Sequence, residues 1–360
     1  MMPNIVVIGA GVLGAAVAWK LAEGGADVTV LDPNPGGVAS PGSFAWLNAS
    51  FAADPVYNRL RHESLLIWMA MKQADASVPV TFPGAVIWEQ DHFDLPAVLA
   101  SQAELGRDAK MLTAGELAER EPKLASVPDT ALLLADDGYG DPARITAWFM
   151  DRACVCGAVI ENLKAEGLEV GNGRVTGVRT TNRVWSADHV ILCAGIGLPN
   201  LLNALGLDLA MLNEPGMLAT TDPAEPAISA MLATPEVHAW QGEDGRYLIG
   251  ADFGGGDAPG DADAEAGNLA AALGRLIPAA AGCAIERTTV RERPMPADGR
   301  PAIGPFGPKG LYVVSTHSGM TLAPLIGNLV SREIATGETD ARLAPYRPDR
   351  AALQREEAEA

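Results

Sequence analysis

The pattern of apolar and polar positions at the amino terminus predicts a strand, a helix and a second strand. Residues 4–8 form an apolar run typical of a buried strand, and residues 12–25 show helical spacing that ends in a glycine pair. Residues 26–32 have the apolar pattern of another strand. Residues 33–43 are rich in Gly, Pro and Ser, so we expect a loop there.

Farther along the chain, helical and strand-like segments follow one another without an internal repeat. Short β-like runs separated by turn residues predict an antiparallel meander that ends in a buried strand, over 167–170, 174–180, 183–188 and 189–195. The other patterns predict a hairpin around Gly245, a strand over 311–319, and helices over 55–73, 96–105, 261–280 and 321–337. Residues 351–360 have the composition of a polar tail.

The charge balance narrows the classes of partner. The 360 residues include 45 acidic side chains and 26 Lys or Arg side chains, which gives a formal net charge of −19. A chain this acidic is a poor partner for nucleic acid or an anionic membrane, and an anionic substrate would need a local positive charge. The length exceeds that of one simple core, so we expect two domains.

The cysteines carry no signature of a metal site or of a disulfide scaffold. Their number is small and their spacing is irregular: Cys154, Cys156, Cys193 and Cys283. We therefore expect no metal, reduced thiols and a cytoplasmic protein. Residues 1–19 lack the positive segment of a signal peptide, and glycines interrupt the apolar runs that could span a membrane.

Three glycines between the first strand and the first helix form a dinucleotide-binding fingerprint. Gly9, Gly11 and Gly14 have the G-x-G-x-x-G spacing. In that motif the first glycine allows a tight turn, the second leaves room for a pyrophosphate, and the third lets the helix pack on the strand. Backbone N–H groups near Val12 and Leu13 would then face the diphosphate. The structural alternative is a Gly-rich helix start in another α/β fold.

Asp32 stands at the end of the second predicted strand, where a carboxylate can accept hydrogen bonds from ribose hydroxyls. An acidic residue at this position disfavours a 2′-phosphate, which argues against NADP and leaves NAD and FAD. After a typical NAD site the parallel sheet would continue as βαβ units. Here helices and an antiparallel meander follow instead.

Four segments in order resemble the D-amino acid oxidase (DAO) family of FAD-dependent oxidoreductases, which includes glycine oxidase, sarcosine oxidase and the D-amino acid dehydrogenases. Beyond the fingerprint they are "GGVASPGSFAW", "HVILCAGIGLPNLL" and "RPMPADGRPAIGPFGPKGLYVVSTHSGMTLAPLIG". The last segment is the most specific. The resemblance covers nearly the whole chain. It implies oxidation of the C–N bond of an amino acid or secondary amine, by hydride transfer to flavin N5 that leaves an imine.

The start of the last predicted helix suits a flavin on physical grounds as well. Gly319, Met320 and Thr321 open this helix directly after a buried strand. The positive end of the helix dipole and the free N–H groups there would stabilise negative charge that grows on the flavin during reduction.

The resemblance assigns further residues to FAD. It places Ser40 and Ser43 along the diphosphate and the approach to the ring. It makes Ala165 a backbone contact to adenine, and it makes Gly195 the residue that lets a strand end close over the cofactor.

Two departures from sarcosine oxidase concern the flavin ring. Those enzymes tether FAD through a cysteine about seven positions before the Asp of the last segment. Counting back from Asp298 gives Arg291, so we expect noncovalent FAD. They also carry an oxygen-activating lysine in the hairpin strand, where this chain offers Leu248. The electron acceptor therefore stays open between oxygen and another carrier.

Arg293 is the candidate for binding the substrate. By resemblance, an arginine at this position holds the substrate carboxylate, and a guanidinium can do so with two parallel hydrogen bonds. The alternative is an ion pair with Glu292 or Glu286. His317 precedes the flavin-facing turn, where it could tune the cofactor or bind substrate, and a packed structural histidine is the alternative.

Large aromatic side chains commonly line substrate clefts, although core packing is the better explanation for each one taken singly. The candidates here are Trp46, Trp88, His238, Trp240 and Tyr247.

Together, the patterns and the resemblance predict a mixed α/β (α+β) fold. It comprises a Rossmann-like FAD-binding domain with a three-layer sheet and a substrate domain with an antiparallel sheet. We expect the FAD-binding domain over 1–50, 138–205 and 295–350, and the substrate domain over 51–137 and 206–294. An NAD-linked dehydrogenase and a flavoprotein subunit that needs a partner chain stay open as alternatives.

Overall fold

The computed structural model describes residues 3–50, 54–89, 94–251 and 260–353. The chain divides into two compact units, in each of which distant segments come together. Unit 1 is drawn from Met1–Pro41, Ala143–Glu214 and Glu292–Ala360, and unit 2 from Gly42–Pro142 and Pro215–Arg291.

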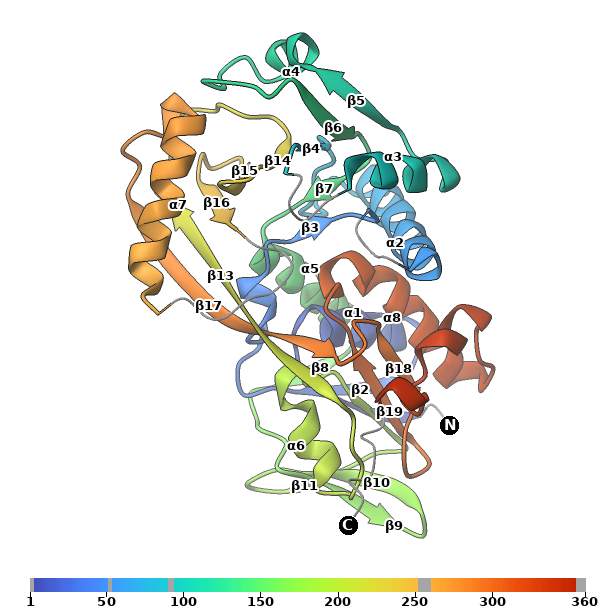
Figure 1. Ribbon diagram of the computed structural model, residues 1–360. Coiled ribbons are helices and arrows are strands. Elements are labelled where there is room, and N and C mark those ends of the chain that lie inside the picture. The colour runs from blue at the N-terminus through green and yellow to red at the C-terminus, as the bar shows by residue number, and fades with distance from the viewer. Residues whose placement is uncertain (1–2, 51–53, 90–93, 252–259, 354–360) are drawn as a thin grey trace, which may run out of the picture. The chain divides into compact units, whose positions relative to one another are not determined.

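Unit 1 contains a mostly parallel sheet with the first strand near its centre (Figure 1). Its six described strands lie in the order β18 (Ala302–Pro305), β19 (Leu311–Ser315), β12 (His189–Leu192), β1 (Asn4–Ile8), β2 (Asp27–Leu31) and β8 (Val159–Glu161). The edge strand β18 is antiparallel to β19, and the other neighbours are parallel. The carboxyl ends of β1, β2 and β12 therefore meet at one edge of the sheet.

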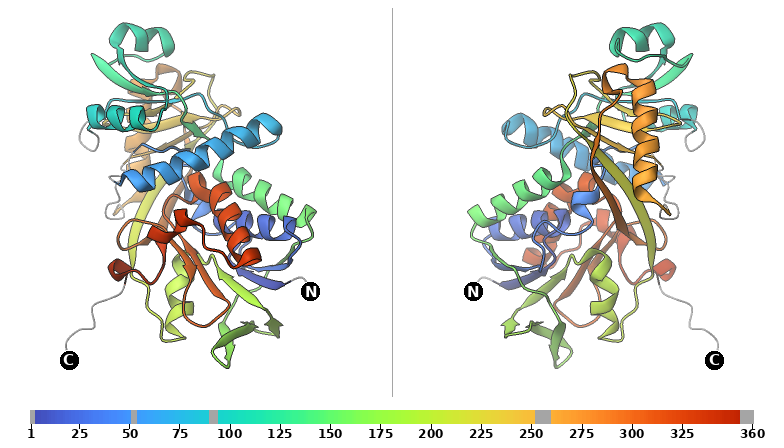
Figure 2. Two further views of the ribbon diagram at one scale, coloured as in Figure 1. Left: turned by 90° about the vertical axis from the view of Figure 1, so that its right-hand side faces the viewer. Right: turned by 90° about the vertical axis from the view of Figure 1, so that its left-hand side faces the viewer.

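Two different layers cover the faces of this sheet. Helices α1 (Val12–Glu23) and α8 (Gly319–Thr336) pack together on one side, as Figure 2 shows. On the other side, Val6 and Ile8 of β1 share a buried cluster with Val175 and Val178 of the meander. The meander strands are β9 (Gly167–Gly171), β10 (Arg174–Arg179) and β11 (Val184–Ser186). The expected three-layer, Rossmann-like arrangement is confirmed.

Unit 2 is built on a second, mixed sheet in which antiparallel pairs predominate. Its eight described strands lie in the order β17 (Ile285–Pro296), β13 (Met211–Thr221), β16 (Tyr247–Gly250), β15 (His238–Gln241), β14 (Met231–Ala233), β4 (Ala85–Ile87), β6 (Thr130–Leu134) and β5 (Ala109–Thr113). A short antiparallel pair joins β3 (Trp46–Leu47) to β7 (Gly138–Tyr139). The helices of this unit are α2 (Pro55–Ala74), α3 (Leu95–Glu104), α4 (Ala114–Arg120) and α7 (Ala262–Leu276).

Local chemistry explains several element ends. The Asp54 carboxylate accepts a hydrogen bond from the Val56 N–H, so it caps the start of α2. Gly337 ends α8 in the left-handed conformation with φ of 71°, which glycine adopts without strain. Gly245, with φ of 83°, forms the turn of the β15–β16 hairpin.

The strand–helix–strand start, the hairpin and the helix over α2 are confirmed, with ends within two residues of the expected ones. The helix expected over 261–280 ends earlier, at Leu276. The strand expected to close the meander, β12, instead pairs in parallel with β1. Helices α5 (Pro142–Val155) and α6 (Leu198–Asn203) and the long strands β13 and β17 were not predicted. The expected polar tail begins with a 3-10 turn, Ala351–Leu353, whose Leu353 is fully buried.

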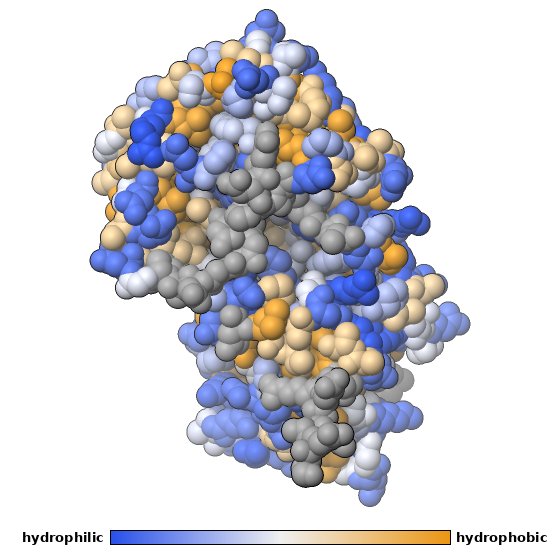
Figure 3. Space-filling view, viewed as in Figure 1, coloured by the Kyte–Doolittle hydropathy of each residue, from blue (hydrophilic) through white to orange (hydrophobic). Residues whose placement is uncertain are grey.

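Hydrophilic and apolar residues intermingle on the face drawn in Figure 3. The large apolar side chains that are exposed come from several parts of the chain, for example Val38 of a loop, Val155 of α5 and Val184 of β11. Within the described residues, no helix combines the length and the apolar character needed to cross a membrane.

Candidate active site

The glycine loop after β1 has the close contacts that the fingerprint requires. Gly9 has φ of 105°, and a Cβ placed there would lie 2.3 Å from the Cys193 carbonyl oxygen. A Cβ on Gly14 would lie 1.8 Å from the Gly9 carbonyl oxygen, so α1 packs against the end of β1 only with glycine at this position. The loop thus brings the start of α1 to the carboxyl end of the sheet.

The start of α1 leaves backbone donors available at this edge. Its N-cap residue is Gly11, which makes no side-chain cap hydrogen bond. The Val12 N–H donates to Ser40 Oγ at 3.0 Å. Ser40 therefore lies beside the glycine loop, where the sequence placed it, and a ligand anion could replace it as acceptor. Leu13 occupies the next position of this first turn.

Asp32 lies one residue beyond β2 and is buried. Its Oδ2 accepts the Ala10 N–H at 2.6 Å, and its Oδ1 accepts the Asn34 N–H at 2.7 Å. These two bonds fix the carboxylate beside the glycine loop. Because a carboxylate offers about four lone-pair positions, acceptor capacity remains for ribose hydroxyls.

The start of α8 lies against the start of α1. A Cβ on Gly319 would lie 3.4 Å from Val12 Cγ1. The N-cap Ser318 makes no side-chain cap among the described residues, and Met320 and Thr321 follow buried in the first turn. Two helix N-termini whose N-cap residues, Gly11 and Ser318, make no side-chain cap hydrogen bond therefore lie together in unit 1. This arrangement fits a ligand with an anionic diphosphate and a second site of developing negative charge.

Pro294, the residue after Arg293, lies beside Gly195 at the same edge. Gly195 follows β12 with φ of 54°, and a Cβ there would lie 3.9 Å from Pro294, the residue after Arg293. Arg293 itself is partly buried on β17. Of its two expected alternative partners, Glu286 instead forms a bidentate ion pair with Arg246, with N–O distances of 2.7 and 2.9 Å.

Three other expected residues have different surroundings. Ala165 lies between β8 and β9 and packs against the core between the parallel sheet and the meander. Ser43 belongs to unit 2, where its Oγ accepts the Ala45 N–H at 3.0 Å. His317 is exposed in the turn between β19 and α8.

In unit 2, two of the aromatic candidates form one wall. Trp46 of β3 pairs with Tyr139 of β7 in the short sheet. The Tyr139 ring stacks on Trp240 with centroids 4.7 Å apart, and the Trp240 indole N–H donates to the Phe44 carbonyl. Leu248, which we expect at the position of the oxygen-activating lysine of sarcosine oxidases, belongs to the same buried cluster.

The other aromatic candidates have different surroundings. Tyr247 is fully buried in the core beneath α7, and its hydroxyl finds no hydrogen-bond partner among the described residues, while Trp88 packs against the same core. This contact supports core packing for both. His238 is buried, with its Nε2 2.5 Å from Glu89 Oε2.

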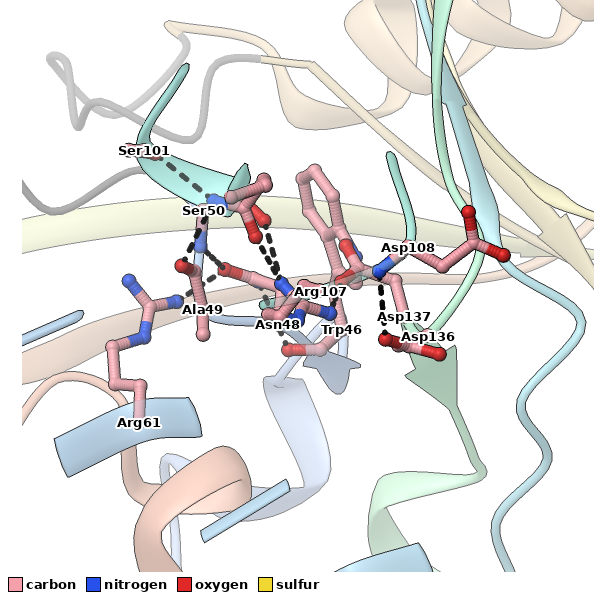
Figure 4. Close-up of polar contacts among 11 residues, drawn as sticks. Trp46, Asn48, Ala49, Ser50, Arg61, Ser101, Arg107, Asp108, Asp136 and Asp137 are labelled. Carbon is pink, nitrogen blue, oxygen red and sulfur yellow. Dashed lines mark hydrogen bonds and ion pairs between the residues drawn. The ribbon is translucent and has the colours of Figure 1, made fainter. Parts of the chain in front are cut away.

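A buried polar cluster lies beside Trp46 and was not predicted from the sequence (Figure 4). Asp137 accepts Arg107 Nη2 at 2.6 Å and the Trp46 indole N–H at 2.8 Å. Arg61 lies at the edge of this cluster and donates to the Asn48 side-chain oxygen. Burial raises the pKa of Asp137 and lowers the pKa of Arg61.

A signal for Arg61 does exist in the sequence. One face of α2 is formed by buried residues at helical spacing, which are Tyr57, Leu60, Leu65 and Trp68. The same spacing puts Arg61 on that face, four positions after Tyr57. An arginine on an apolar helix face indicates a buried charge.

The chain matches the DAO family, described as FAD dependent oxidoreductase, over residues 4–333. It is 26% identical to the glycine oxidase of Pseudomonas putida in an alignment 389 positions long, which covers 97% of this chain and 99% of that protein. The fold is similar to glycine oxidase from Geobacillus kaustophilus, with a TM-score of 0.84, 22% identity, and coverage of 97% and 99% of the two chains. It is also similar to iminodiacetate oxidase from Chelativorans sp. BNC1, with a TM-score of 0.79, 25% identity, and coverage of 96% and 99%.

The family match decides between the two cofactors that Asp32 left open. It begins at β1 and extends into α8, so it includes both helix N-termini described above. The cofactor is accordingly FAD rather than NAD. The chain belongs to the DAO family of FAD-dependent oxidoreductases.

Proposed function

We propose that this enzyme oxidises the C–N bond of an amino acid or a secondary amine to an imine. Two relatives support the proposal, since their names state action on glycine and on iminodiacetate. Both compounds carry an amine next to a carboxylate. The shared chemistry is an anchored carboxylate and an oxidisable carbon beside nitrogen.

The observation that carries the proposal is the position of Arg293. Pro294 lies against Gly195, just beyond the carboxyl end of β12. Since β12 and β1 are parallel, this is also the edge that holds the glycine loop. Arg293 therefore belongs to the end of unit 1 at which α/β sheets bind their ligands.

Two sets of residues would hold the cofactor. The diphosphate would be bound by the glycine loop and the first turn of α1, that is by Gly9, Gly11, Val12, Leu13 and Gly14. Asp32 would accept hydrogen bonds from the ribose hydroxyls. The rest of the cofactor would be lined by Ser40, Ser43, Ala165 and Gly195. The first turn of α8, with Gly319, Met320 and Thr321, would face the flavin ring. We assign FAD binding to residues 1–50, 138–205 and 295–350, and substrate binding to residues 51–137 and 206–294. When bound, FAD supplies the two-electron acceptor for hydride from the α-carbon, while the nitrogen lone pair closes the imine.

The protein's own part in this chemistry is placement and charge. The Arg293 guanidinium would clamp the substrate carboxylate through two parallel hydrogen bonds and so fix the α-carbon. The positive end of α8 would favour negative charge near its first turn. We assign His317, beside that turn, a tuning role. The substrate amine would bind deprotonated, so no strong general base is required.

We further propose noncovalent FAD, since Arg291 replaces the tethering cysteine, and an acceptor that is either oxygen or a separate carrier, since Leu248 replaces the lysine. All four cysteines lie in the described part of the chain and are free thiols, which supports the cytoplasmic assignment.

The direct test is anaerobic bleaching of the flavin absorbance by a panel of D-, L- and N-methyl amino acids. We expect at least one class to reduce the flavin. A protein that binds FAD but is reduced by none of these amines would instead favour a subunit that needs a partner chain. A subsequent oxygen-uptake measurement separates the two acceptors.

A further inference from the structure

The turn that follows Arg293 and the end of β17 is held by an arginine near the carboxyl end of the described residues. Arg350 Nε donates to Asp298 Oδ2 at 2.8 Å, and its Nη2 donates to Asp298 Oδ1 at 2.7 Å. The two side chains are 15% and 17% exposed, so the pair is largely shielded from water. An arginine–carboxylate pair with two parallel hydrogen bonds fixes orientation as well as distance.

Asp298 belongs to a tight turn that begins where β17 ends. The Gly299 N–H donates to the Pro296 carbonyl at 2.8 Å, and Gly299 has φ of 73°. The Arg300 N–H donates to Asp298 Oδ1 at 3.2 Å. Arg350 Nη2 also donates to the Arg300 carbonyl at 3.2 Å. Arg350 therefore binds both a side chain and the backbone of this turn.

Backbone hydrogen bonds tie the same turn to residues 341–353, which we call the C-terminal segment. The Ala297 N–H donates to the Ala210 carbonyl at 2.9 Å, and the Ala210 N–H donates to the Leu353 carbonyl at 3.1 Å. Leu353 is fully buried in the cluster against which Ala297 packs. Backbone from three distant parts of the sequence is thus joined in one row beyond the end of β17.

The C-terminal segment is itself anchored on the sheet and on α8. Arg347 donates to the Ile303 carbonyl of β18 at 3.2 Å and to the Glu333 carboxylate of α8 at 2.5 Å. Arg350 Nη1 donates to the Arg347 carbonyl at 3.0 Å. The segment is therefore a fixed support for the turn.

Little conformational freedom separates this turn from Arg293. The residues between Arg293 and the turn are Pro294, Met295 and Pro296. Each proline ring restricts its own φ to about −65°. Pro294 also lies beside Gly195, as described above. A displacement of the turn would therefore move the backbone of Arg293 and would not be absorbed between them.

We infer that Arg350 is a positioning residue for substrate binding, because through Asp298 it holds the strand end from which Arg293 binds the substrate carboxylate. This inference rests on the proposed function. A binding residue must be held within about 0.5 Å of its productive position, so a small displacement weakens a clamp of two parallel hydrogen bonds. All residues in this network belong to unit 1.

The test measures carboxylate binding by the holoenzyme in two ways. Anaerobic rapid-mixing kinetics give the limiting rate constant of flavin reduction and the Kd of the best amine. A titration with acetate, a carboxylate without an amine, gives a second Kd from the change in flavin absorbance. The variants are Arg350→Gln, Arg350→Lys, Asp298→Asn, Arg293→Leu, and Arg350→Gln combined with Arg293→Leu.

Arg342→Gln is the matched control. Arg342 forms an equally close pair with Asp340, with distances of 2.8 and 2.7 Å, and both residues lie at the start of the C-terminal segment or directly before it. This substitution removes the same chemistry from the same part of the chain, so it should leave both Kd values unchanged.

We expect Arg350→Gln and Asp298→Asn to raise both Kd values by about 5- to 20-fold, with the limiting rate constant and the Kd of FAD within about twofold of the wild type. Arg350→Lys should recover part of the loss, since it keeps the charge but not the two-bond geometry. Adding Arg350→Gln to Arg293→Leu should change both Kd values by less than about twofold, because the two residues act on one interaction.

Two results would overturn the inference. One is unchanged Kd values in Arg350→Gln, where a lower melting temperature would mark the pair with Asp298 as purely structural. The other is an equal loss from Arg350→Gln with and without Arg293, since the effect would then not pass through Arg293. If Arg350→Gln does not retain FAD, the same criteria apply to Asp298→Asn, whose side-chain oxygen can still accept the Arg300 N–H.

Failure of the proposed function gives a different result. If Arg293→Leu binds the amine and acetate like the wild type, the proposed clamp fails, and the inference fails with it. A loss in Arg293→Leu without a loss in Arg350→Gln defeats only the inference. If no amine reduces the flavin, the proposed reaction fails, and the acetate titration still decides whether Arg350 acts through Arg293.

Discussion

The backbone of α8 packs directly on that of α1 at Gly327 and Ala16. A Cβ on Gly327 would lie 2.8 Å from the Ala16 carbonyl oxygen. One turn farther along α8, Ser331 Oγ donates to the Lys20 carbonyl at 2.8 Å. This contact holds two segments that are more than 300 residues apart in the sequence. It fixes the spacing of the two helix N-termini that we assign to FAD.

Replacing Gly327 by Val should therefore weaken FAD binding without touching the cofactor site itself. The added side chain must push the helices apart, and overpacking of this kind costs about 1–3 kcal/mol. We expect a lower melting temperature and a dissociation constant for FAD raised by at least about tenfold, measured by fluorescence titration. Gly267→Ala in α7 is the matched control, because nothing lies within 4 Å of its Cβ position. An unchanged FAD affinity in Gly327→Val would show that helix spacing is not critical.

Arg293 offers the most direct test of substrate binding. Loss of two charge-assisted hydrogen bonds in Arg293→Leu should lower kcat/KM for the best amine roughly 10- to 200-fold, mainly through KM. Arg293→Lys should recover part of the loss, since it keeps the charge but not the bidentate geometry. Arg287→Leu, an exposed arginine on the same strand, should behave like the wild type. Wild-type KM in Arg293→Leu would remove the clamp from the mechanism.

Much of unit 1 could be predicted because its signals are local. The apolar run of β1, the glycines of the loop and the acid after β2 lie within 32 residues, and each has one dominant physical reading. The end of α8 at Gly337 was equally readable, since glycine tolerates φ of 71° there.

The unpredicted elements depend on contacts between distant segments. Strands β13 and β17 contain Pro215, Pro294 and several charged residues, so neither shows a regular alternation of apolar and polar positions. Their pairing in the sheet determines their conformation, and sequence propensity does not reveal it. Helix α5 is different, because Ile145, Phe149 and Ala153 have helical spacing and are all buried. That signal was present in the sequence and was overlooked.

In the candidate site, too, the local signals could be predicted from the sequence and the contacts between distant segments could not. Gly195 and Arg293 were each found by resemblance, but their approach through Pro294 required the fold. The polar cluster around Arg61 also contains Arg107 and Asp137, which come from other elements. Periodicity could place Arg61 on a buried face, but it could not reveal which partners were already engaged.

The attachment of the cofactor gives a simple chemical prediction. Arg291 is exposed and its Nη1 donates to the Val290 carbonyl at 2.8 Å, and an arginine cannot form a thioether to flavin. Acid precipitation should therefore release FAD into the supernatant and leave a colourless pellet. The absorbance spectra of the two fractions provide the measurement. Yellow colour retained by the washed pellet would reveal a covalent bond.

A buried ion pair in unit 1 should make stability depend on acidity. Glu333, on α8, accepts the Tyr312 hydroxyl at 2.6 Å, Arg347 at 2.5 Å and the Thr339 hydroxyl at 3.0 Å. Burial acts to raise the pKa of Glu333, but the hydrogen bonds from Arg347 and Tyr312, together with the Arg347 charge, leave this pKa below its ordinary value of 4.5. The folded state thus binds this proton less tightly than the unfolded chain does.

The stabilisation from Glu333 is therefore fully present above the ordinary glutamate pKa and is lost as the pH falls through the lower, folded value. Glu333→Gln should reduce the free energy of unfolding at pH 7 by about 1–3 kcal/mol, because it leaves the Arg347 charge without its partner. The difference from the wild type should shrink in acid, as urea titrations at several pH values would measure. Glu338→Gln, an exposed neighbour, should show little difference at any pH. A Glu333→Gln deficit that stayed constant down to strong acid would mean that packing, and not the ion pair, stabilises this end of α8.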